Sequence, residues 1–329
     1  MTPGPRARPG SPTGSTLGWL LVLLSVGPGA AAQNAPPAGL DLHRPGLVGP
    51  LAPAAVELGR RLFHDSGLSA DSSRSCADCH DPSTAFSDTV RVSTGVGGQR
   101  GRRNSPSLVN RGDLLSFFWD GRIRSLETAV LQAVVDPDEM DLSVTEAVSR
   151  LRRSDAYVEV FESAFGEAPS WSGVGRALAA FVGSLRSGGS PADRFALGDS
   201  AALSTLAREG RRLFEGEAGC WVCHSGPFFT DGRLHNTGVS WGGPDTGLHL
   251  RTGQEADRGR FRTAPLRDAA KTPPYMHDGS LATLRDVVEH YDRGGGANPL
   301  LDSELRPLDL TEREKRALVA FLESLTGTS

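Results

Sequence analysis

Apolar residues recur at helical spacing in several stretches of the chain, whereas the strict alternation typical of a half-buried strand is scarce. The two clearest helical stripes consist of Val174, Leu178, Phe181 and Leu185, and of Leu318, Phe321, Leu322 and Leu325. The first ends at Gly188-Gly189, and the second follows a Thr311-x-x-Glu314 capping box. We therefore predict a mostly α-helical protein whose helices are connected by long loops.

The start of the chain has the three-part pattern of a secretory signal peptide. A short basic region contains Arg6 and Arg8, an apolar run covers 17–26, and the small residues Ala30-Ala31-Ala32 follow. This run is shorter than the ~20 residues of a membrane-spanning helix, although an uncleaved anchor is the alternative interpretation. We predict a signal peptide over residues 1–32, a linker over 33–50, and a periplasmic protein without stable membrane insertion after cleavage.

Composition and charge narrow the class of protein. The 329 residues include 40 Gly and 22 Pro without a collagen-like repeat, which favours a loop-rich fold over disorder. The formal net charge of -4 leaves no basic surplus to neutralise phosphates. Nucleic acid is therefore not expected as a partner.

The four cysteines form two copies of one motif, C-x-x-C-H. They are Cys76-Ala77-Asp78-Cys79-His80 and Cys220-Trp221-Val222-Cys223-His224. Two thiols at this spacing can each add to a haem vinyl group, and the following imidazole then lies beneath the iron. A zinc half-site or a redox dithiol would explain one such motif, but two intact copies in an exported chain favour haem. We predict two covalent haem c groups, with His80 and His224 as iron ligands and no cysteine left for a disulfide.

The sequence around the two motifs also repeats. Gly59-Arg60-Arg61-Leu62-Phe63 precedes the first motif and Gly210-Arg211-Arg212-Leu213-Phe214 the second, and an aromatic residue and an acid follow each histidine. Such a duplication predicts two tandem cytochrome c-like haem domains, over 51–190 and 191–329, with a hinge between Ser187 and Ser200. Chance similarity in an Arg-rich and Gly-rich chain is the alternative for the flanking segments.

The sixth ligand of each iron decides between electron transfer and peroxide chemistry. No histidine lies between His80 and His224. Further on, Thr283 and Asp286 begin a predicted helix on which Leu284, Val287, Val288 and Tyr291 share one face. Tyr291 is therefore expected to point inward and His290 away from this face. A Tyr291 phenolate would favour the ferric iron of the second haem, and an ordinary core tyrosine is the alternative.

Together the motifs resemble the bacterial di-haem cytochrome c peroxidase/MauG superfamily over nearly all of the chain after the signal peptide. Beyond the two C-x-x-C-H motifs, the segments that carry the resemblance are 103–107, 118–122, 136–140, 274–279 and 290–295. The resemblance implies that Trp119 relays electrons between the haems and that Glu139, with a raised pKa, moves protons above the peroxidatic first haem. It also implies that Asn104, Thr272 and Pro274 bind a calcium ion. Core packing for Trp119 and a surface position for Glu139 are the alternatives.

Four positions depart from the classical peroxidases of this superfamily. The loop from Val92 to Gln99 has no distal histidine, and Tyr291 stands where a methionine would bind the second haem; both features match the MauG-like branch. The distal glutamine of both branches falls at Ala129. No tryptophan precedes Cys220 as a surface relay, although Trp221 lies within the motif.

The favoured function is an exported di-haem peroxidase that reduces hydrogen peroxide with electrons from a small c-type cytochrome or cupredoxin. One alternative is a MauG-like enzyme that oxidises side chains of a partner protein through a bis-Fe(IV) state. A second is a di-haem electron carrier in which His64 or Met140 caps the first haem, and a third is a degenerate haem sensor.

Arginine supplies nearly all of the positive charge, since Lys271 and Lys315 are the only lysines. Arginine suits buried haem propionates because it can pair with a carboxylate through two parallel hydrogen bonds. The sequence does not distinguish which arginines do so. A solvated surface is the expectation for Arg100, Arg102 and Arg103.

Overall fold

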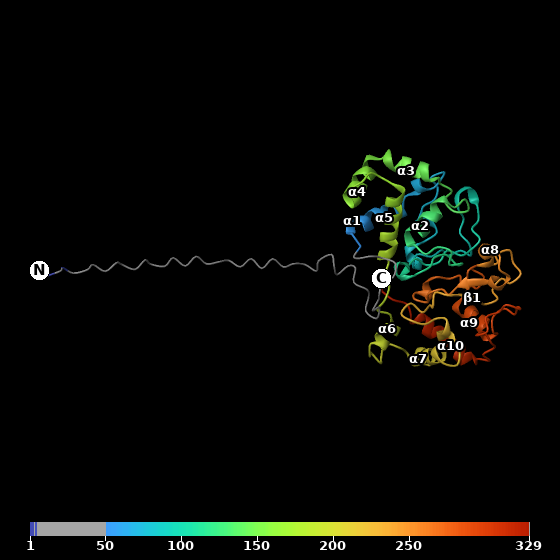
Figure 1. Cartoon of the computed structure of the whole chain (residues 1–329). Helices are drawn as coiled ribbons and strands as arrows, with labels where there is room; N and C mark the ends of the chain where they lie inside the picture. The colour runs from blue at the N-terminus through green and yellow to red at the C-terminus, as the bar shows by residue number, and fades with distance from the viewer. Residues whose placement is uncertain (3, 5–50, 329) are drawn as a thin grey trace.

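The computed structural model describes residues 1, 2, 4 and 51–328. The predicted signal peptide and linker lie outside the described residues, apart from positions 1, 2 and 4. The described chain is mostly helical, as expected (Figure 1). Its α-helices are α1 (Pro53–Phe63), α2 (Leu126–Val135), α3 (Val144–Arg152), α4 (Asp155–Phe165), α5 (Trp171–Ser184), α6 (Pro191–Ala196), α7 (Thr205–Glu215), α8 (His249–Thr252), α9 (Leu284–Asp292) and α10 (Glu312–Glu323). Strands β1 (Leu234–Asn236) and β2 (Arg260–Arg262) pair antiparallel, with His235 opposite Phe261.

The helices predicted from apolar periodicity are present. Val174, Leu178 and Phe181 of the first stripe lie on α5, where Ser170 caps the first turn by accepting a hydrogen bond from the Gly173 amide; the helix ends at Ser184, before Leu185 and the expected Gly188-Gly189. Leu318, Phe321 and Leu322 of the second stripe lie on α10, which ends at Glu323, and the Thr311 and Glu314 capping box is formed. None of the described helices is long and apolar enough to cross a membrane.

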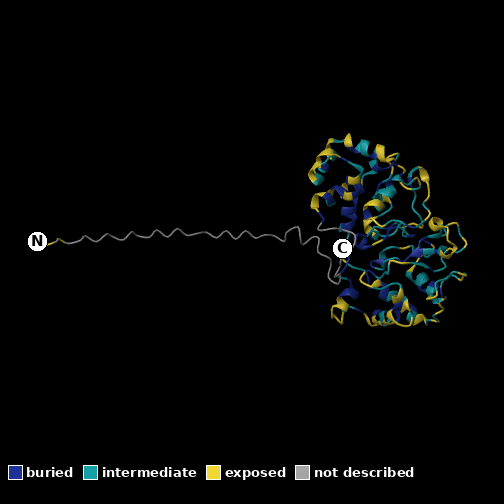
Figure 2. Ribbon diagram, in the orientation of Figure 1, coloured by how far each residue is buried: buried dark blue, intermediate teal, exposed yellow. Residues whose placement is uncertain are grey.

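Among the described residues, the two largest hydrophobic cores occupy the two halves of the molecule. Helices α1 to α5 surround the first core, in the upper half of Figure 1, and α6, α7, α9 and α10 surround the second, in the lower half. Buried residues are concentrated inside each group of helices (Figure 2). The start of the segment predicted as a hinge is held by hydrogen bonds to both halves of the chain. Ser187 is 1% exposed and its carbonyl accepts a hydrogen bond from Asn110, while Gly188 bridges to Thr328 near the C-terminus.

The repeated Gly-Arg-Arg-Leu-Phe segments have the same packing role in both halves. Each places a glycine where its helix crosses another helix closely. A Cβ atom on Gly59 of α1 would overlap the Ala177 carbonyl of α5, and one on Gly210 of α7 would overlap the Ala317 carbonyl of α10. The duplication seen in the sequence therefore specifies two equivalent helix crossings, each of which requires a residue without a side chain.

We expect Gly210→Ala to lower the free energy of unfolding by about 1–3 kcal/mol, the range for overpacked cores, although alanine adds roughly 1 kcal/mol of helix propensity. The reason is that the added Cβ meets a backbone carbonyl, which cannot move without its helix. Chemical denaturation of the purified protein measures the change. Gly101→Ala is the control, because a Cβ at Gly101 meets its nearest neighbour at 3.6 Å. An unchanged denaturation midpoint for Gly210→Ala would contradict the prediction.

Candidate functional site

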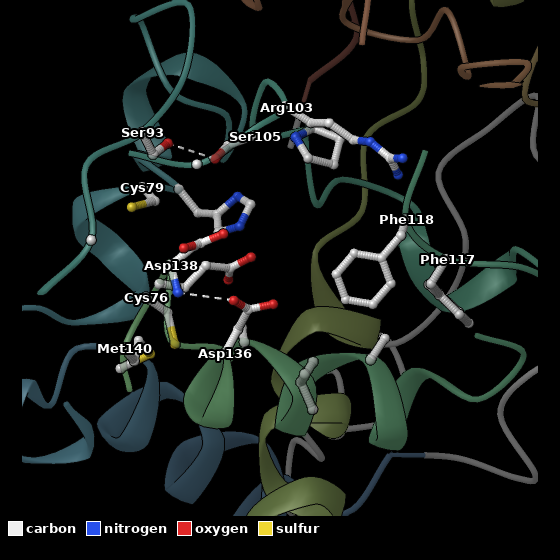
Figure 3. Close-up of a pocket in the computed structure, with 18 of the residues that line it drawn as sticks. Cys76, Cys79, Ser93, Arg103, Ser105, Phe117, Phe118, Asp136, Asp138 and Met140 are labelled. Carbon is white, nitrogen blue, oxygen red and sulfur yellow. Dashed lines mark hydrogen bonds between the residues drawn. The ribbon is translucent and has the colours of Figure 1, made fainter. Parts of the chain in front are cut away.

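The first C-x-x-C-H motif lines a cavity of about 610 Å³ in the N-terminal half. Cys76 begins a short 3₁₀ turn, Cys76–Asp78, and Cys79 and His80 follow directly. All three side chains face the cavity. In Figure 3, Cys76, Cys79 and Met140 lie on one side of the cavity and Phe118 on the other.

The second motif lines another cavity, of about 250 Å³, in the C-terminal half. Cys220, Cys223 and His224 contribute to its wall from the 3₁₀ turn Cys220–Val222 and the residues after it. Tyr291 reaches the same cavity from α9, as the helical pattern predicted. His290 does not line this cavity, but it is also buried, at 8% exposed, with Nε2 3.0 Å from the Thr237 carbonyl oxygen.

Each motif histidine is held in the same orientation by a backbone carbonyl. Nδ1 of His80 lies 2.9 Å from the Phe86 oxygen, and Nδ1 of His224 lies 2.9 Å from the Phe229 oxygen. Because a carbonyl only accepts hydrogen bonds, Nδ1 carries the proton and Nε2 keeps its lone pair for a metal. Phe86 and Phe229 both have left-handed backbone conformations, with φ of 56° and 54°. The aromatic residue after each motif was visible in the sequence, but its part in orienting the histidine was not.

Burial keeps both histidines neutral. It lowers the pKa of His80 to about 4 and also lowers the pKa of His224. A neutral imidazole with a free Nε2, two nearby thiols and an adjoining cavity are the features that a covalently attached haem requires. The donor chemistry at both sites therefore fits haem c.

A shared wall separates the two cavities. Asn104, Arg111 and Trp119 line both of them. The Trp119 indole donates a hydrogen bond to the Asn104 carbonyl oxygen at 2.8 Å, and its ring meets the His277 ring edge-on with centroids 6.4 Å apart. His277 stacks on Phe261 at 3.5 Å, and its buried Nε2 has no hydrogen-bond partner among the residues that the structure describes. Trp119 is thus fixed between the two sites.

Glu139 lines the first cavity. Glu139 is an exposed residue, as the alternative of a surface position would have it, yet its carboxylate lies among enough protein atoms of the cavity wall to be desolvated. Desolvation there, reinforced by the nearby Asp136 carboxylate, raises the pKa of Glu139 to about 7. Gly95 packs against the backbone of Asp138 and Glu139, and the Val96 amide donates to the Glu139 carbonyl oxygen at 2.8 Å. The loop without a distal histidine therefore holds the backbone of Glu139, a role that the sequence did not reveal.

Of the two residues that could cap the iron of the first site, Met140 lies at the cavity and His64 does not. Met140 is buried and lines the cavity. Ala129, at the position of the expected distal glutamine, also lines it. His64 is exposed, binds the Arg60 carbonyl oxygen at 2.9 Å, and does not line either cavity.

The three residues expected at a calcium site line the second cavity together. Asn104 donates its amide to the Val90 carbonyl oxygen at 3.2 Å, and its own backbone carbonyl accepts from Trp119. Thr272 and Pro274 approach from the segment that precedes His277. These residues offer oxygen donors, which suit a hard cation.

A cluster beside the second motif was not anticipated. His235 lies 2.9 Å from Asp231 and 2.6 Å from Asp302, and ligand atoms of Cys223, Asp231 and His235 all lie within 4.8 Å of one another. Hydrogen bonding to the Cys223 sulfur and to the two carboxylates raises the pKa of His235 to about 10. Since Cys223 belongs to the haem-binding motif, the cluster forms part of the surroundings of the second site.

One sequence expectation about charge is wrong. Arg103 was expected on a solvated surface, but its side chain is only 15% exposed. It pairs with Asp120 at 2.8 Å and with Asp245 at 2.6 Å. The cause is a long-range contact, because Asp245 lies 142 residues away in the chain.

Comparisons with known proteins agree with this arrangement. Residues 53–201 match the di-haem cytochrome c peroxidase family. The chain is 42% identical over 279 residues to the methylamine utilization protein MauG of Methylorubrum extorquens, covering 84% of this chain and 79% of that protein. It is 35% identical over 305 residues to cytochrome-c peroxidase IdrP2 of Pseudomonas sp. (strain SCT), covering 84% and 82%. The crystal structure of a MauG-like protein associated with microbial copper homeostasis superposes with a TM-score of 0.80 at 32% identity, covering 89% and 94%.

Proposed function

Because the chain belongs to the di-haem cytochrome c peroxidase family, we propose that it is an exported di-haem enzyme that reduces hydrogen peroxide with electrons from a small c-type cytochrome or cupredoxin. The observation that carries the proposal is the shared wall. Two cavities, each with a C-x-x-C-H motif, meet at Trp119, and one of them contains a carboxylate with a pKa near neutrality.

The residues that would hold the cofactors follow from the cavity walls. Cys76 and Cys79 would attach the first haem and Cys220 and Cys223 the second, with His80 and His224 as iron ligands. Tyr291 would be the second ligand of the C-terminal iron. Bound haem supplies a redox-active iron and, where one axial side is open, a site for peroxide.

Glu139 would move the protons. As a carboxylate it can accept a proton from one oxygen of hydrogen peroxide and return it to the other oxygen, which leaves as water. The complete reaction consumes one peroxide, two electrons and two protons and gives two waters. A carboxyl group with a pKa of about 7 is suited to both halves of this transfer.

Trp119 would connect the two sites for electrons, since it is the aromatic side chain that lines both cavities and has a large, oxidisable ring. Electrons from outside would arrive at the C-terminal site. There Trp221 and Val222, between the two cysteines of the second motif, are 40% and 55% exposed. An exposed apolar surface beside a haem attachment point suits brief contact with a small redox protein.

A second candidate function is oxidation of side chains in a partner protein. Tyr291 at the second cavity favours it, as does the absence of histidine from Val92–Gln99. The chain is also 42% identical to a protein named MauG. The placement of Glu139 and Trp119 serves both chemistries.

The deciding experiment is the electronic and EPR spectrum of the purified ferric protein before and after one equivalent of peroxide, followed by turnover with a reduced small c-type cytochrome. We expect mixed high-spin and low-spin signals and catalytic oxidation of the cytochrome. A long-lived oxidised state that oxidises the cytochrome only slowly would favour partner-protein oxidation. Two low-spin haems that do not react with peroxide would refute the proposal in favour of an electron carrier.

Replacing Tyr291 with phenylalanine tests the ligand assignment. We expect Tyr291→Phe to change the low-spin ferric signal of the second haem, because a phenyl ring cannot bind iron. Tyr275→Phe is the matched control: Tyr275 lines the same cavity, and its hydroxyl donates to the Ala269 carbonyl oxygen at 3.0 Å. Identical EPR spectra for Tyr291→Phe and the parent protein would remove Tyr291 from the site.

We further propose that Asn104, Thr272 and Pro274 bind one calcium ion at the second cavity. Metal analysis of the mature protein is expected to find one calcium per chain, which a chelator removes and added calcium restores. Asn104→Ala should lose this calcium. Calcium retained in that variant would contradict the assignment.

A further inference from the structure

Two guanidinium groups are buried at the cavities without a carboxylate partner. Arg111 is 6% exposed and lines both cavities, and Arg262 is 3% exposed and lines the second. Their hydrogen bonds go to backbone oxygens: Arg111 Nε to Ser107 at 2.6 Å, Arg262 Nε to Phe118 at 3.2 Å, and Arg262 Nη1 to Thr263 at 3.3 Å. Neither arginine forms an ion pair within the described residues.

Such an arrangement is costly in a folded protein. A buried charge is normally paired, because its lost hydration is not recovered otherwise. Here burial lowers the pKa of Arg111 well below its ordinary value, and the charge of Arg262 lowers it further. Burial also lowers the pKa of Arg262 to about 10. Two cations that repel each other in a desolvated wall require anions from another source.

The internal repeat provides a contrast within the same chain. Arg103 begins Arg103-Asn104-Ser105-Pro106, and Arg262 begins the similar segment Arg262-Thr263-Ala264-Pro265. Arg103 is neutralised by the carboxylates of Asp120 and Asp245. Arg262, at the corresponding position, contacts only carbonyl oxygens and borders the second cavity. The missing anions are therefore expected inside the cavities.

We propose that Arg111 and Arg262 form an anion site for the porphyrin propionates, with Arg111 serving both cavities and Arg262 the second. The proposal rests on the haem assignment of the proposed function. A guanidinium group pairs with a carboxylate through two parallel hydrogen bonds, and the nitrogens of Arg111 other than Nε are free for this geometry.

This placement has a consequence for electron transfer. Positive charge at the porphyrin carboxylates favours the ferrous over the ferric state, because it offsets negative charge near the iron. Arg111, which borders both cavities, would raise the reduction potential of both haems, and Arg262 mainly that of the second.

The test is a spectroscopic redox titration of each haem in the mature di-haem protein. For Arg111→Gln we expect the ferric-to-ferrous equilibrium constant of both haems to fall about tenfold, an effect typical of removing one charge from a weakly screened interior. A tenfold change corresponds to about 59 mV for a one-electron couple. For Arg262→Gln we expect a fall of this size at the second haem and a smaller one at the first. Arg111→Lys should keep most of the parent potential because it retains the charge, and Arg100→Gln, on the exposed surface, should not change it.

Unchanged potentials in both glutamine variants would overturn the proposal, as would equal shifts for lysine and glutamine at Arg111. A crystal structure of the unmodified di-haem protein tests it without any variant: propionates that point away from both guanidinium groups would refute it. A protein that holds both haems but does not consume peroxide would contradict the proposed function and still test the arginines.

Discussion

Glu139→Gln is expected to slow peroxide consumption by about 10²–10⁴-fold, the usual contribution of a positioned general acid or base. Glutamine keeps the shape of the side chain in the first cavity but cannot take up or release a proton. Initial rates with excess reduced cytochrome, measured on protein with both haems in place, test the prediction. A variant that retains a third or more of the parent rate would show that Glu139 does not carry the protons.

The pH dependence of the same rate identifies the group. Because desolvation at the cavity wall and the nearby Asp136 carboxylate raise the pKa of Glu139 to about 7, the carboxylate is mostly protonated below that pH and cannot accept a proton from peroxide. We therefore expect kcat/KM for peroxide to fall as the pH decreases through about 7 and to level off above it. Glu139→Gln should abolish this step in the profile.

Asp136→Asn provides a matched control. Asp136 raises the pKa of Glu139 through like-charge repulsion, and its Oδ1 accepts a hydrogen bond from the Asp138 amide at 3.0 Å, which asparagine can also do. This variant should keep the plateau rate but move the midpoint of the profile to lower pH. An unmoved midpoint would mean that a group other than Glu139 is titrating.

Arg267→Leu is expected to lower the free energy of unfolding by about 3–5 kcal/mol, the typical cost of removing one member of a buried ion pair. Arg267 and Asp193 have side chains only 4% and 7% exposed and meet through two hydrogen bonds, of 2.7 and 2.8 Å. Desolvation would raise the pKa of Asp193, but the hydrogen bonds from Arg267 hold it below its ordinary value. Leucine would leave this carboxylate buried and charged without its partner.

Chemical denaturation of the purified protein measures the loss. The double variant Arg267→Leu/Asp193→Leu should recover part of the stability, because it removes the unpaired carboxylate as well. For comparison, Arg60→Leu removes an exposed pair with Glu57, side chains 54% and 46% exposed, and should cost no more than about 1 kcal/mol. Equal losses for Arg267→Leu and Arg60→Leu would contradict the prediction.

The local sequence predicted those features that depend on contacts between residues close together in the chain. The apolar stripe of α5 and the Thr311 capping box of α10 involve residues within a few turns of each other, so their periodicity and spacing predicted the helices. The spacing within each C-x-x-C-H motif likewise placed two thiols and an imidazole on one cavity wall. The repeat preceding the motifs indicated a duplication, and the structure shows its physical basis in the crossings at Gly59 and Gly210.

The relation between the two halves could not be predicted from local patterns. Without the family resemblance, Trp119 was an ordinary aromatic residue, yet the tertiary structure places it in the wall of both cavities. The orientation of His80 and His224 depends on the left-handed backbone at Phe86 and Phe229, which apolar periodicity does not encode.

By itself, therefore, the sequence determined the helices, the duplication and the two haem-binding motifs of this protein, because neighbouring residues specify all three. Only the tertiary structure decided the environment of each charge. Arg103 pairs with a carboxylate 142 residues away, while Arg111 and Arg262, chemically the same, are buried without a carboxylate partner in the described part of the chain. The physical reason is that the desolvation and pairing of an ionised group depend on what the whole fold brings next to it.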